Sequence, residues 1–579
     1  MSFKYITLVL IILISTKFKV YSQGLDLGEL LHYKGKYFKL NGGVNASSSF
    51  NHSNDIKIVR QPFSYIFNGN MNIQFMSWSI PFNFTYTNLK ATYGYQNPFK
   101  INRISINPKY KWLTLHIGDN NGTISPYTLN GLIFTGGGFD IAPPKSKIKI
   151  NALYGRFLKA TTDTVSIPTY KRLGWGLKAE YTIKKHKIAL SLFHAKDKIN
   201  SQLLSTIYDE SRVTPQENIC MSFSSQSAIN QFMDVNIEYS TSILTRDIRD
   251  VYESEVRNPF SLLIKKNATT TSFNAFKTNL NINTKKRKVT IGIEHVDPNY
   301  RSLGALYFNN DFENITLGIT QSFLKKKLTA NFNGGLQRDN LYNQKLRSTK
   351  RFVGSINMNY SLNKKINMTG SYSSFQTFSA MTSQFERINQ PNVPLTIDTL
   401  TYVQLSDNAS LNTIYKLVQN KISNQSLNLS LVWQKASNAE NGYVKQSSGN
   451  QIVNSNISYI MQRLKSGLSI TSSFNITVLK NNLQQTLILG PVASVSYKNK
   501  KTGLNTSYSF LYNESYINDK HIGINAMNRM SISTTIKKKH NLGMNASWMY
   551  RKINSNAGGI NQKNITQTIL ATINYGYTF

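Results

Sequence analysis

Apolar and polar residues alternate in runs of about ten residues along almost the whole chain. From position 67 to 75 apolar residues hold the odd positions, apart from Gly69, and asparagine or glutamine holds the even ones. From Trp78 to Tyr86 the apolar residues hold the even positions. Successive side chains of a strand point to opposite faces, so these two runs predict a hairpin whose apolar faces coincide.

Three further hairpins repeat this design around the short basic turns at 184–187, 325–327 and 364–365. A soluble β-sandwich also alternates, so other features must decide between the two folds. Aromatic residues near strand ends, very short turns on one side and longer polar loops on the other are typical of a transmembrane barrel. The chain has all three, with short turns expected near 76, 108, 144, 185, 227, 286, 326, 364, 419, 464, 500 and 538.

About twelve hairpins, a first strand near 38–48 and a last strand near 564–579 predict an all-β fold of about 26 strands, within a range of about 22 to 26. The predicted fold is a single large antiparallel transmembrane β-barrel. Both chain ends then lie on the short-turn side, which we expect to be periplasmic, with the longer loops extracellular.

The N-terminus predicts export. An apolar run from Ile6 to Ser15 precedes Val20, Tyr21 and Ser22, which resemble a signal-peptide cleavage site. A retained membrane anchor is the alternative, but the run is short for a bilayer and two lysines follow it. We therefore expect residues 1–22 to be a signal peptide, 23–36 a short periplasmic segment, and 37–579 a barrel in the cell outer membrane.

The last strand keeps its alternation to the end of the chain. Its aromatic residues Tyr575, Tyr577 and Phe579 resemble the C-terminal signal that the outer-membrane barrel assembly machinery recognises. The resemblance predicts that this machinery is a partner.

The net charge of +39 arises largely from lysines in the short turns, represented by Lys185, Lys286, Lys326 and Lys538. Such a basic periplasmic rim could contact anionic head groups of outer-membrane lipids, or its lysines could simply be solvated. This placement argues against nucleic acid as a partner. Lumen-facing charges of both signs, among them Arg156, Lys178 and Glu238, predict no clear ion selectivity.

A glycine-rich region is the least strand-like part of the chain. Glycines at this density permit tight bends or close backbone approach, so the region could be a lumen constriction; an ordinary bulged turn is the alternative. The candidate residues are Gly118, Asp119, Ser125, Tyr127, Gly131, Gly136, Gly137 and Gly138.

A second cluster gathers charged and amide groups at the outer ends of neighbouring hairpins. It predicts a hydrogen-bonded outer loop platform that could bind a surface ligand. Its candidate residues are Asp297, Tyr300, Asn310, Asp311, Arg338 and Asp339. Both regions resemble segments of large uncharacterised outer-membrane β-barrels of Bacteroidota-type bacteria, a resemblance that spans most of the mature chain and implies fold and location.

The residues predict no catalytic, cofactor or metal site. Cys220 is the only cysteine, and the scattered histidines form no constellation with serine or aspartate, so we do not expect an enzyme. Strand-like alternation begins by about Phe38, which leaves too little chain for the plug of a TonB-dependent transporter. We expect a channel or translocation pore for a solute or polymer. The alternatives are a surface anchor whose loops bind a partner, and an export component that works with periplasmic proteins.

Overall fold

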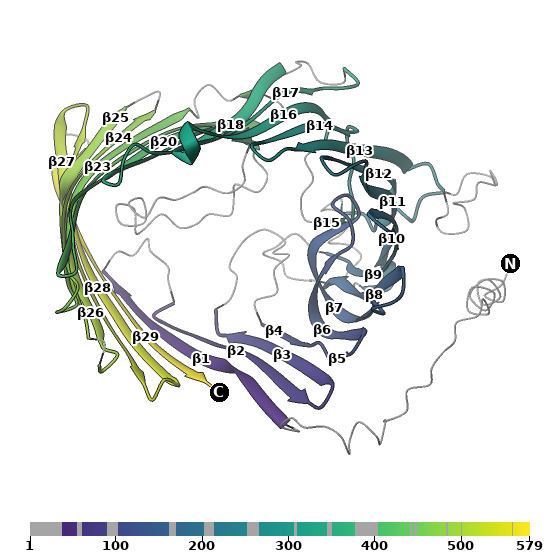
Figure 1. Cartoon of the computed structure of the whole chain (residues 1–579), viewed down its shortest axis with the longest axis horizontal. Coiled ribbons are helices and arrows are strands. Elements are labelled where there is room, and N and C mark those ends of the chain that lie inside the picture. Colours follow the sequence, from purple (N-terminus) through teal and green to yellow (C-terminus); the bar gives the residue numbers. More distant parts are fainter. Residues whose placement is uncertain are drawn as a thin grey trace.

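The fold was obtained as a computed structural model of the full chain (Figure 1). The structure describes residues 38–54, 61–89, 102–160, 169–201, 213–251, 264, 266–305, 310–343, 350–376, 403–440, 443–444, 449–481, 484–499, 501–557 and 560–579. The predicted signal peptide (1–22) and periplasmic segment (23–36) lie outside these residues. No helix within the described ranges is long and apolar enough to cross a membrane.

The alternating runs form the strands of one sheet. In the first half of the chain these are β1 (Phe38–Ser53), β2 (Phe63–Phe75), β3 (Trp78–Thr87), β4 (Arg103–Ile106), β5 (Lys109–Tyr110), β6 (Leu113–Thr123), β7 (Leu129–Ile141), β8 (Ile148–Leu158), β9 (Lys171–Ile183), β10 (His186–Lys198), β11 (Glu217–Ala228), β12 (Met233–Thr245), β13 (Thr270–Asn283), β14 (Arg287–Val296) and β15 (Gly304–Ala305).

The second half continues the same sheet. Its strands are β16 (Phe312–Phe323), β17 (Leu328–Asp339), β18 (Lys350–Ser361), β19 (Ile366–Gln376), β20 (Val403–Gln419), β21 (Ser423–Glu440), β22 (Tyr443–Val444), β23 (Asn450–Arg463), β24 (Leu468–Asn481), β25 (Gln485–Lys498), β26 (Asn505–Ile517), β27 (Lys520–Ile536), β28 (His540–Ala557) and β29 (Ile560–Thr578).

The sheet closes into a barrel because its first and last strands pair (Figure 1). Strand β1 pairs antiparallel with both β2 and β29. The short strands β4 and β5 together occupy one position in the wall, while β15 and β22 are short additions to it. The wall thus has 26 antiparallel strands, which confirms the predicted fold and strand number.

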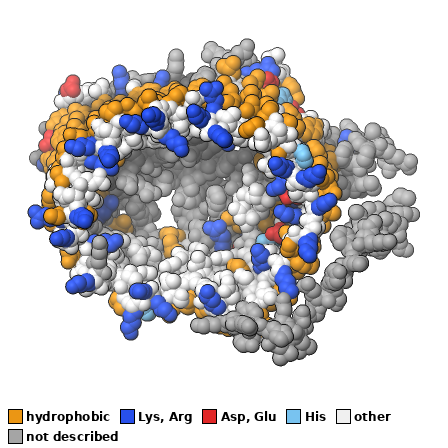
Figure 2. Space-filling view, viewed as in Figure 1, with side chains coloured by type: hydrophobic (Ala, Val, Ile, Leu, Met, Phe, Trp, Pro, Cys, Tyr) orange, Lys and Arg blue, Asp and Glu red, His pale blue; other side chains and the backbone are white. Residues whose placement is uncertain are grey.

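The outer face of the wall is apolar. Leu190, Leu336 and Ile569 are 62%, 69% and 48% exposed, and comparable residues recur at every second position around the ring. Figure 2 shows this apolar band on the outside of the barrel. Such a continuous exposed apolar surface would be an aggregation hazard in water, but it is what a barrel needs to face hydrocarbon.

The turns differ in length between the two ends of the barrel, as predicted. On one side, which we call the short-turn rim, most connections are a few residues long and several have positive φ angles. Lys537 and Lys538 have φ of 52° and 59°, as a tight hairpin with the right-handed twist of its strands requires. Most of the longer connections lie at the opposite end, and both Phe38 and Phe579 lie near the short-turn rim.

The inner face is largely polar and forms side-chain ladders between strands. The Ser49 hydroxyl lies 3.1 Å from the Thr572 hydroxyl across the closure, and the Thr477 hydroxyl donates to the Asn454 amide oxygen at 2.6 Å. These contacts pair hydroxyl and amide groups that face the lumen, so the wall presents hydrogen-bonding groups inward and apolar groups outward.

Cysteine substitutions at two neighbouring residues of β28 would test which face of the wall is the lumen face and which is the membrane face. Asn545 points inward and Met544 points outward, where it is 48% exposed. In liposomes or cells, we expect a charged, membrane-impermeant thiol reagent to modify Asn545→Cys at least about tenfold faster than Met544→Cys, because only the lumen side is wet. Mass spectrometry would measure the labelling, with the wild type, whose Cys220 is buried, as background. Equal labelling of both variants would contradict the assignment.

Candidate functional site

Two outer connections fold inward and pack against one arc of the wall (Figure 1). The first joins β6 to β7 and includes residues 124–128, and the second follows β14 and includes residues 297–305. They meet where β15 pairs in parallel with the start of β7. We call the two connections together the inward element.

The inward element builds a hydrophobic core inside the barrel. Tyr300 and Leu129 are fully buried, and the Tyr127 and Tyr300 rings meet edge to face at 6.2 Å. Inward-pointing residues of the wall complete the cluster, which contains Ile124, Tyr127, Leu129, Leu132, Phe134, Leu153, Phe157, Phe193, Ala195, Cys220, Leu244, Phe273, Ala275, Val296, Tyr300 and Leu303. A cluster of this size buries enough apolar surface to hold the two connections against the wall.

Inward-facing glycines of the wall make room for this core. A Cβ on Gly155 would lie 2.7 Å from the Phe134 ring, and a Cβ on Gly174 would lie 3.0 Å from the Phe157 ring. A Cβ on Gly176 would clash with the Ile124 side chain. The absence of side chains at these positions therefore lets the inward element approach the wall closely.

Hydrogen bonds from the first connection end on carboxylates of the wall. The Ser125 hydroxyl donates to Glu238 and the Tyr127 hydroxyl donates to Glu294, both at 2.5 Å. Burial, followed by the neighbouring Glu294 carboxylate, raises the pKa of Tyr127 well above its usual range. Tyr127 therefore stays protonated and remains a donor to Glu294.

Further bonds tie the two connections to each other and to the wall. The Tyr300 hydroxyl donates to the Tyr127 carbonyl at 2.8 Å, and the Ser302 hydroxyl donates to the Thr128 carbonyl. The Lys178 ammonium donates to the Ile124 carbonyl at 3.0 Å. These contacts satisfy backbone carbonyls that would otherwise lie unpaired in the core.

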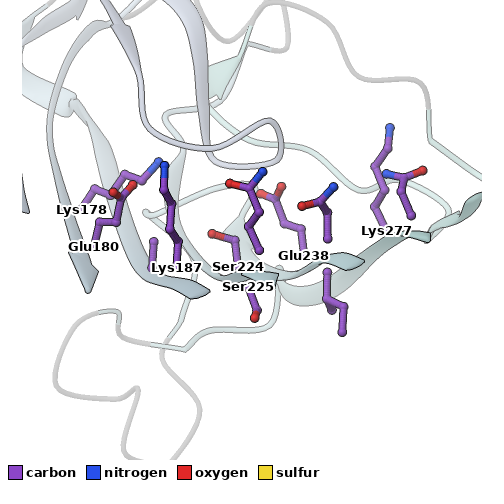
Figure 3. A pocket seen from close by; sticks show the side chains of 12 residues that line it. Lys178, Glu180, Lys187, Ser224, Ser225, Glu238 and Lys277 are labelled. Carbon is purple, nitrogen blue, oxygen red and sulfur yellow. The ribbon is translucent and has the colours of Figure 1, made fainter. Parts of the chain in front are cut away.

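Beside the inward element lies a polar groove of about 270 Å³ in the inner wall (Figure 3). Its lining combines three lysines, two carboxylates and several hydroxyl and amide groups: Lys178, Glu180, Lys187, Ala189, Ser224, Ser225, Gln226, Asn236, Ile237, Glu238, Lys277 and Asn279. Figure 3 shows Lys178 and Lys187, from the neighbouring strands β9 and β10, toward one end of the groove and Lys277 toward the other.

Charges in the groove are partly compensated. The Lys277 ammonium lies 3.1 Å from the Glu294 carboxylate, and Lys149 lies 3.7 Å from Glu180. Within the described ranges, the Lys187 ammonium group has no hydrogen bond or ion pair. The groove can thus offer hydrogen-bond donors and positive charge to a polar solute. Nowhere in the described part of the chain do three or more His, Cys, Asp or Glu side chains gather as metal ligands would.

The structure separates the predicted glycine-rich site into two parts. Ser125 and Tyr127 lie in the inward element, whereas Gly136, Gly137 and Gly138 are wall residues of β7. Gly118 and Gly131 have positive φ angles of 97° and 71°, and Asp119 accepts a 2.6 Å hydrogen bond from Thr135.

The residues of the predicted outer platform are also divided. Tyr300 is buried in the lumen core, and Asp297 and Asp311 are only 6% and 4% exposed. The Asn310 amide donates to the Tyr300 carbonyl at 3.1 Å, while Arg338 forms an exposed ion pair with Glu313 at 2.7 Å. Asp339 ends β17 next to this region.

Other predicted sites lie in the rim and the closing strand. Lys185, Lys286, Lys326 and Lys538 all fall in turns of the short-turn rim. Tyr575 and Tyr577 pair with Ala46 and Val44 of β1, and the Phe579 amide donates to the Gly42 carbonyl at 2.9 Å.

One residue predicted to face the lumen does not. Arg156 pairs with Leu173 and shares its face with the exposed Tyr154, so the register of β8 turns it outward. The sequence reasoning also missed Lys187, Phe193 and Ser302. Glycines at lumen-facing positions of β8 and β9 could have indicated that another segment packs against the inner wall there. These positions can be recognised as lumen-facing only after strand parity has been assigned.

Comparisons with solved structures return other large barrels. The P pilus usher (PapC) translocation pore matches with 8% sequence identity and a TM-score of 0.40, over 93% of this chain and 99% of that chain. The unliganded ferric citrate transporter FecA matches with 9% identity and a TM-score of 0.37, over 93% and 79%. The FrpB iron transporter from Neisseria meningitidis (F3-3 variant) matches with 11% identity and a TM-score of 0.35, over 93% and 81%.

No protein-family model and no curated protein matches the chain.

A substitution in the wall tests how the inward element is held. Gly176→Val would place methyl groups where Ile124 packs, and overpacking of this kind costs about 1–3 kcal/mol. We expect amide hydrogen exchange in residues 124–130 to accelerate by roughly one to two orders of magnitude, with the wall unchanged. Gly370→Val is the matched control, because the nearest atom to its Cβ, the Ser410 carbonyl oxygen, lies 3.9 Å away. Unchanged exchange in Gly176→Val would show that the glycine is not needed for packing.

Proposed function

We propose that this protein is an outer-membrane channel or translocation pore for a hydrophilic solute or polymer. The observation that carries the proposal is the closed ring of 26 strands with an apolar outer face and a polar inner face. A ring of this size encloses a lumen too wide for side chains of the wall to fill.

The inward element supports this reading because it covers only one arc of the wall. Its contacts reach the inner faces of strands β7 to β14, and among the described residues it makes no contact with the opposite arc. Figure 2 shows the hollow that the described wall surrounds. The inward element would narrow such a channel and place the polar groove along its path.

Single-channel recording tests the proposal directly. We expect the purified full chain to give discrete conductance steps in planar bilayers, because water and ions can fill a polar lumen. Bilayers treated with the same preparation after heat unfolding are the control. A folded barrel that gives no conductance over a wide voltage range would contradict the pore.

The alternative function is a surface anchor whose extracellular loops bind a partner. Burial of Asp297 and Tyr300 leaves these two residues little surface for such a contact. Arg338, on the outer face of β17, and Asn310 are the exposed members of the proposed platform. Ligand capture that survives blockage of the conductance would favour the anchor.

We further propose that the closing strand carries the assembly signal, with Tyr575, Tyr577 and Phe579 as its aromatic residues. We expect Phe579→Ala to lower the amount of folded barrel in the outer membrane severalfold, since it removes the terminal ring of the pattern. The heat-modifiable gel mobility of the barrel would measure folding. Thr578→Ala, an inward-facing neighbour, is the control, and equal losses in both variants would argue against a specific signal.

A further inference from the structure

The short-turn rim is basic and its described turns lack carboxylates, whereas the other end of the barrel carries charges of both signs. Most of the described short turns contain lysines, many in pairs or triplets, and none of these turns contains aspartate or glutamate. The turn lysines are Lys111, Lys145, Lys147, Lys184, Lys185, Lys285, Lys286, Lys325, Lys326, Lys327, Lys364, Lys365, Lys421, Lys465, Lys501, Lys537, Lys538 and Lys539. At the other end carboxylates accompany basic residues, and Asp247 and Glu313 form ion pairs with Arg249 and Arg338. The carboxylates there are Asp247, Asp250, Asp297, Asp311, Glu313, Asp339, Glu514 and Asp519. Figure 2 shows Lys and Arg side chains spread around the barrel rim.

The short turns lie close enough together for the electrostatic potentials of their lysines to overlap. Neighbouring turns are two strands apart, or about 10 Å. The Debye length is about 8 Å at physiological ionic strength and about 30 Å at 0.01 M. The fields of adjacent turns therefore overlap weakly at physiological salt and merge at low salt into a continuous positive potential across the mouth.

Most of the inner wall carries few charged side chains, and those it carries are basic. From β18 to β29 and on through β1 to β3, the lumen face carries mainly asparagine, serine and threonine. Among the described side chains of this arc, the inward-facing charges are Lys39, Lys416, Lys498, Lys520, Arg529 and Arg551, and no inward carboxylate is present. We call it the neutral arc.

The inward carboxylates lie on the opposite arc, where partners hold them. Asp234 accepts hydrogen bonds from Asn281 and Asn283 at 2.7 and 3.1 Å. Glu238 accepts from Ser125 and Ser222, and Glu294 pairs with Lys277. Nearby lysines, including Lys178 and Lys187 in the groove, offset the charge of these carboxylates.

We propose that the lumen is anion-selective and that its substrate is a hydrophilic solute or polymer carrying carboxylate, sulfate or phosphate groups, which enters through the short-turn rim. This inference rests on the proposed pore. Rings of charged side chains set the preferred sign of ions in channels. Here the mouth is positive, and the few inward charges described in the neutral arc are all cations. The carboxylates at the outer end do not cancel a field that is screened within about a Debye length.

Reversal potentials in a KCl gradient across bilayers of uncharged phosphatidylcholine test the proposal. At about 0.01–0.1 M salt we expect chloride to permeate at least about threefold better than potassium, falling toward equal permeability near 1 M as the Debye length shrinks to about 3 Å. Conductance without anion preference would overturn the inference and leave the pore intact. Absence of conductance would instead contradict the pore itself.

Two sets of variants locate the selectivity. The first set combines Arg529→Gln and Arg551→Gln and removes two inward cations. The second set removes four positive charges from the short-turn rim by combining Lys185→Gln, Lys286→Gln, Lys326→Gln and Lys538→Gln. Each set should lower the permeability ratio by about half or more. Lys480→Gln with Lys552→Gln is the matched control, because these outward-facing lysines carry the same charge and Lys552 adjoins Arg551. A ratio that falls equally in the control would overturn the assignment to the lumen.

The lysines of the rim could instead bind anionic lipid head groups, and the same variants distinguish this role from solute entry. Binding of each folded variant to vesicles with and without phosphatidylglycerol would be measured beside the reversal potential, with heat-modifiable mobility confirming that each variant is folded. A rim variant could keep wild-type ion selectivity but lose its preference for anionic vesicles. This result would contradict solute entry at the rim and would show that the rim lysines bind lipid. A variant that loses selectivity in uncharged bilayers supports the proposal.

Discussion

Backbone N–H and C=O groups cannot be left unpaired in hydrocarbon, and the whole architecture depends on how this chain meets that constraint. Residues more than 500 positions apart lie side by side where β1 meets β29. The final residue takes part, since the Phe579 amide donates to the Gly42 carbonyl. Closure leaves no free edge in the ring, so every wall strand has two neighbours and its side chains divide cleanly into an outer and an inner set.

The wall could be predicted from the sequence because its signal is local. A period of two residues identifies a strand within about ten residues, and parity assigns its faces without knowledge of the rest of the fold. The positions of the short turns could also be predicted. The positive φ angles of Lys537 and Lys538 could not, because lysine is not a residue that favours this conformation. Arg156 was misplaced because its polarity suggested the lumen while its register turns it outward.

The inward element could be predicted only in outline, because its contacts are distant in the chain. Ser125 and Glu238 are 113 positions apart, and Tyr127 and Glu294 are 167 apart. Glycine density marked the first connection but could not reveal its partner. The platform prediction for Tyr300 rested on local polarity, whereas the structure uses its ring as a core residue and its hydroxyl as a donor to the Tyr127 carbonyl.

The distribution of polar groups suits a path for a solute in transit. Conduction requires contacts that are favourable enough to admit a solute and weak enough to release it. Asparagine, serine and threonine side chains replace hydrogen bonds to water at little net gain, so the neutral arc would not trap what passes. For the proposed anionic solute, rim lysines that act over about a Debye length would raise the rate of entry more than the strength of binding. Glu238 and Glu294 already accept short hydrogen bonds from the inward element, so these two carboxylates position that element.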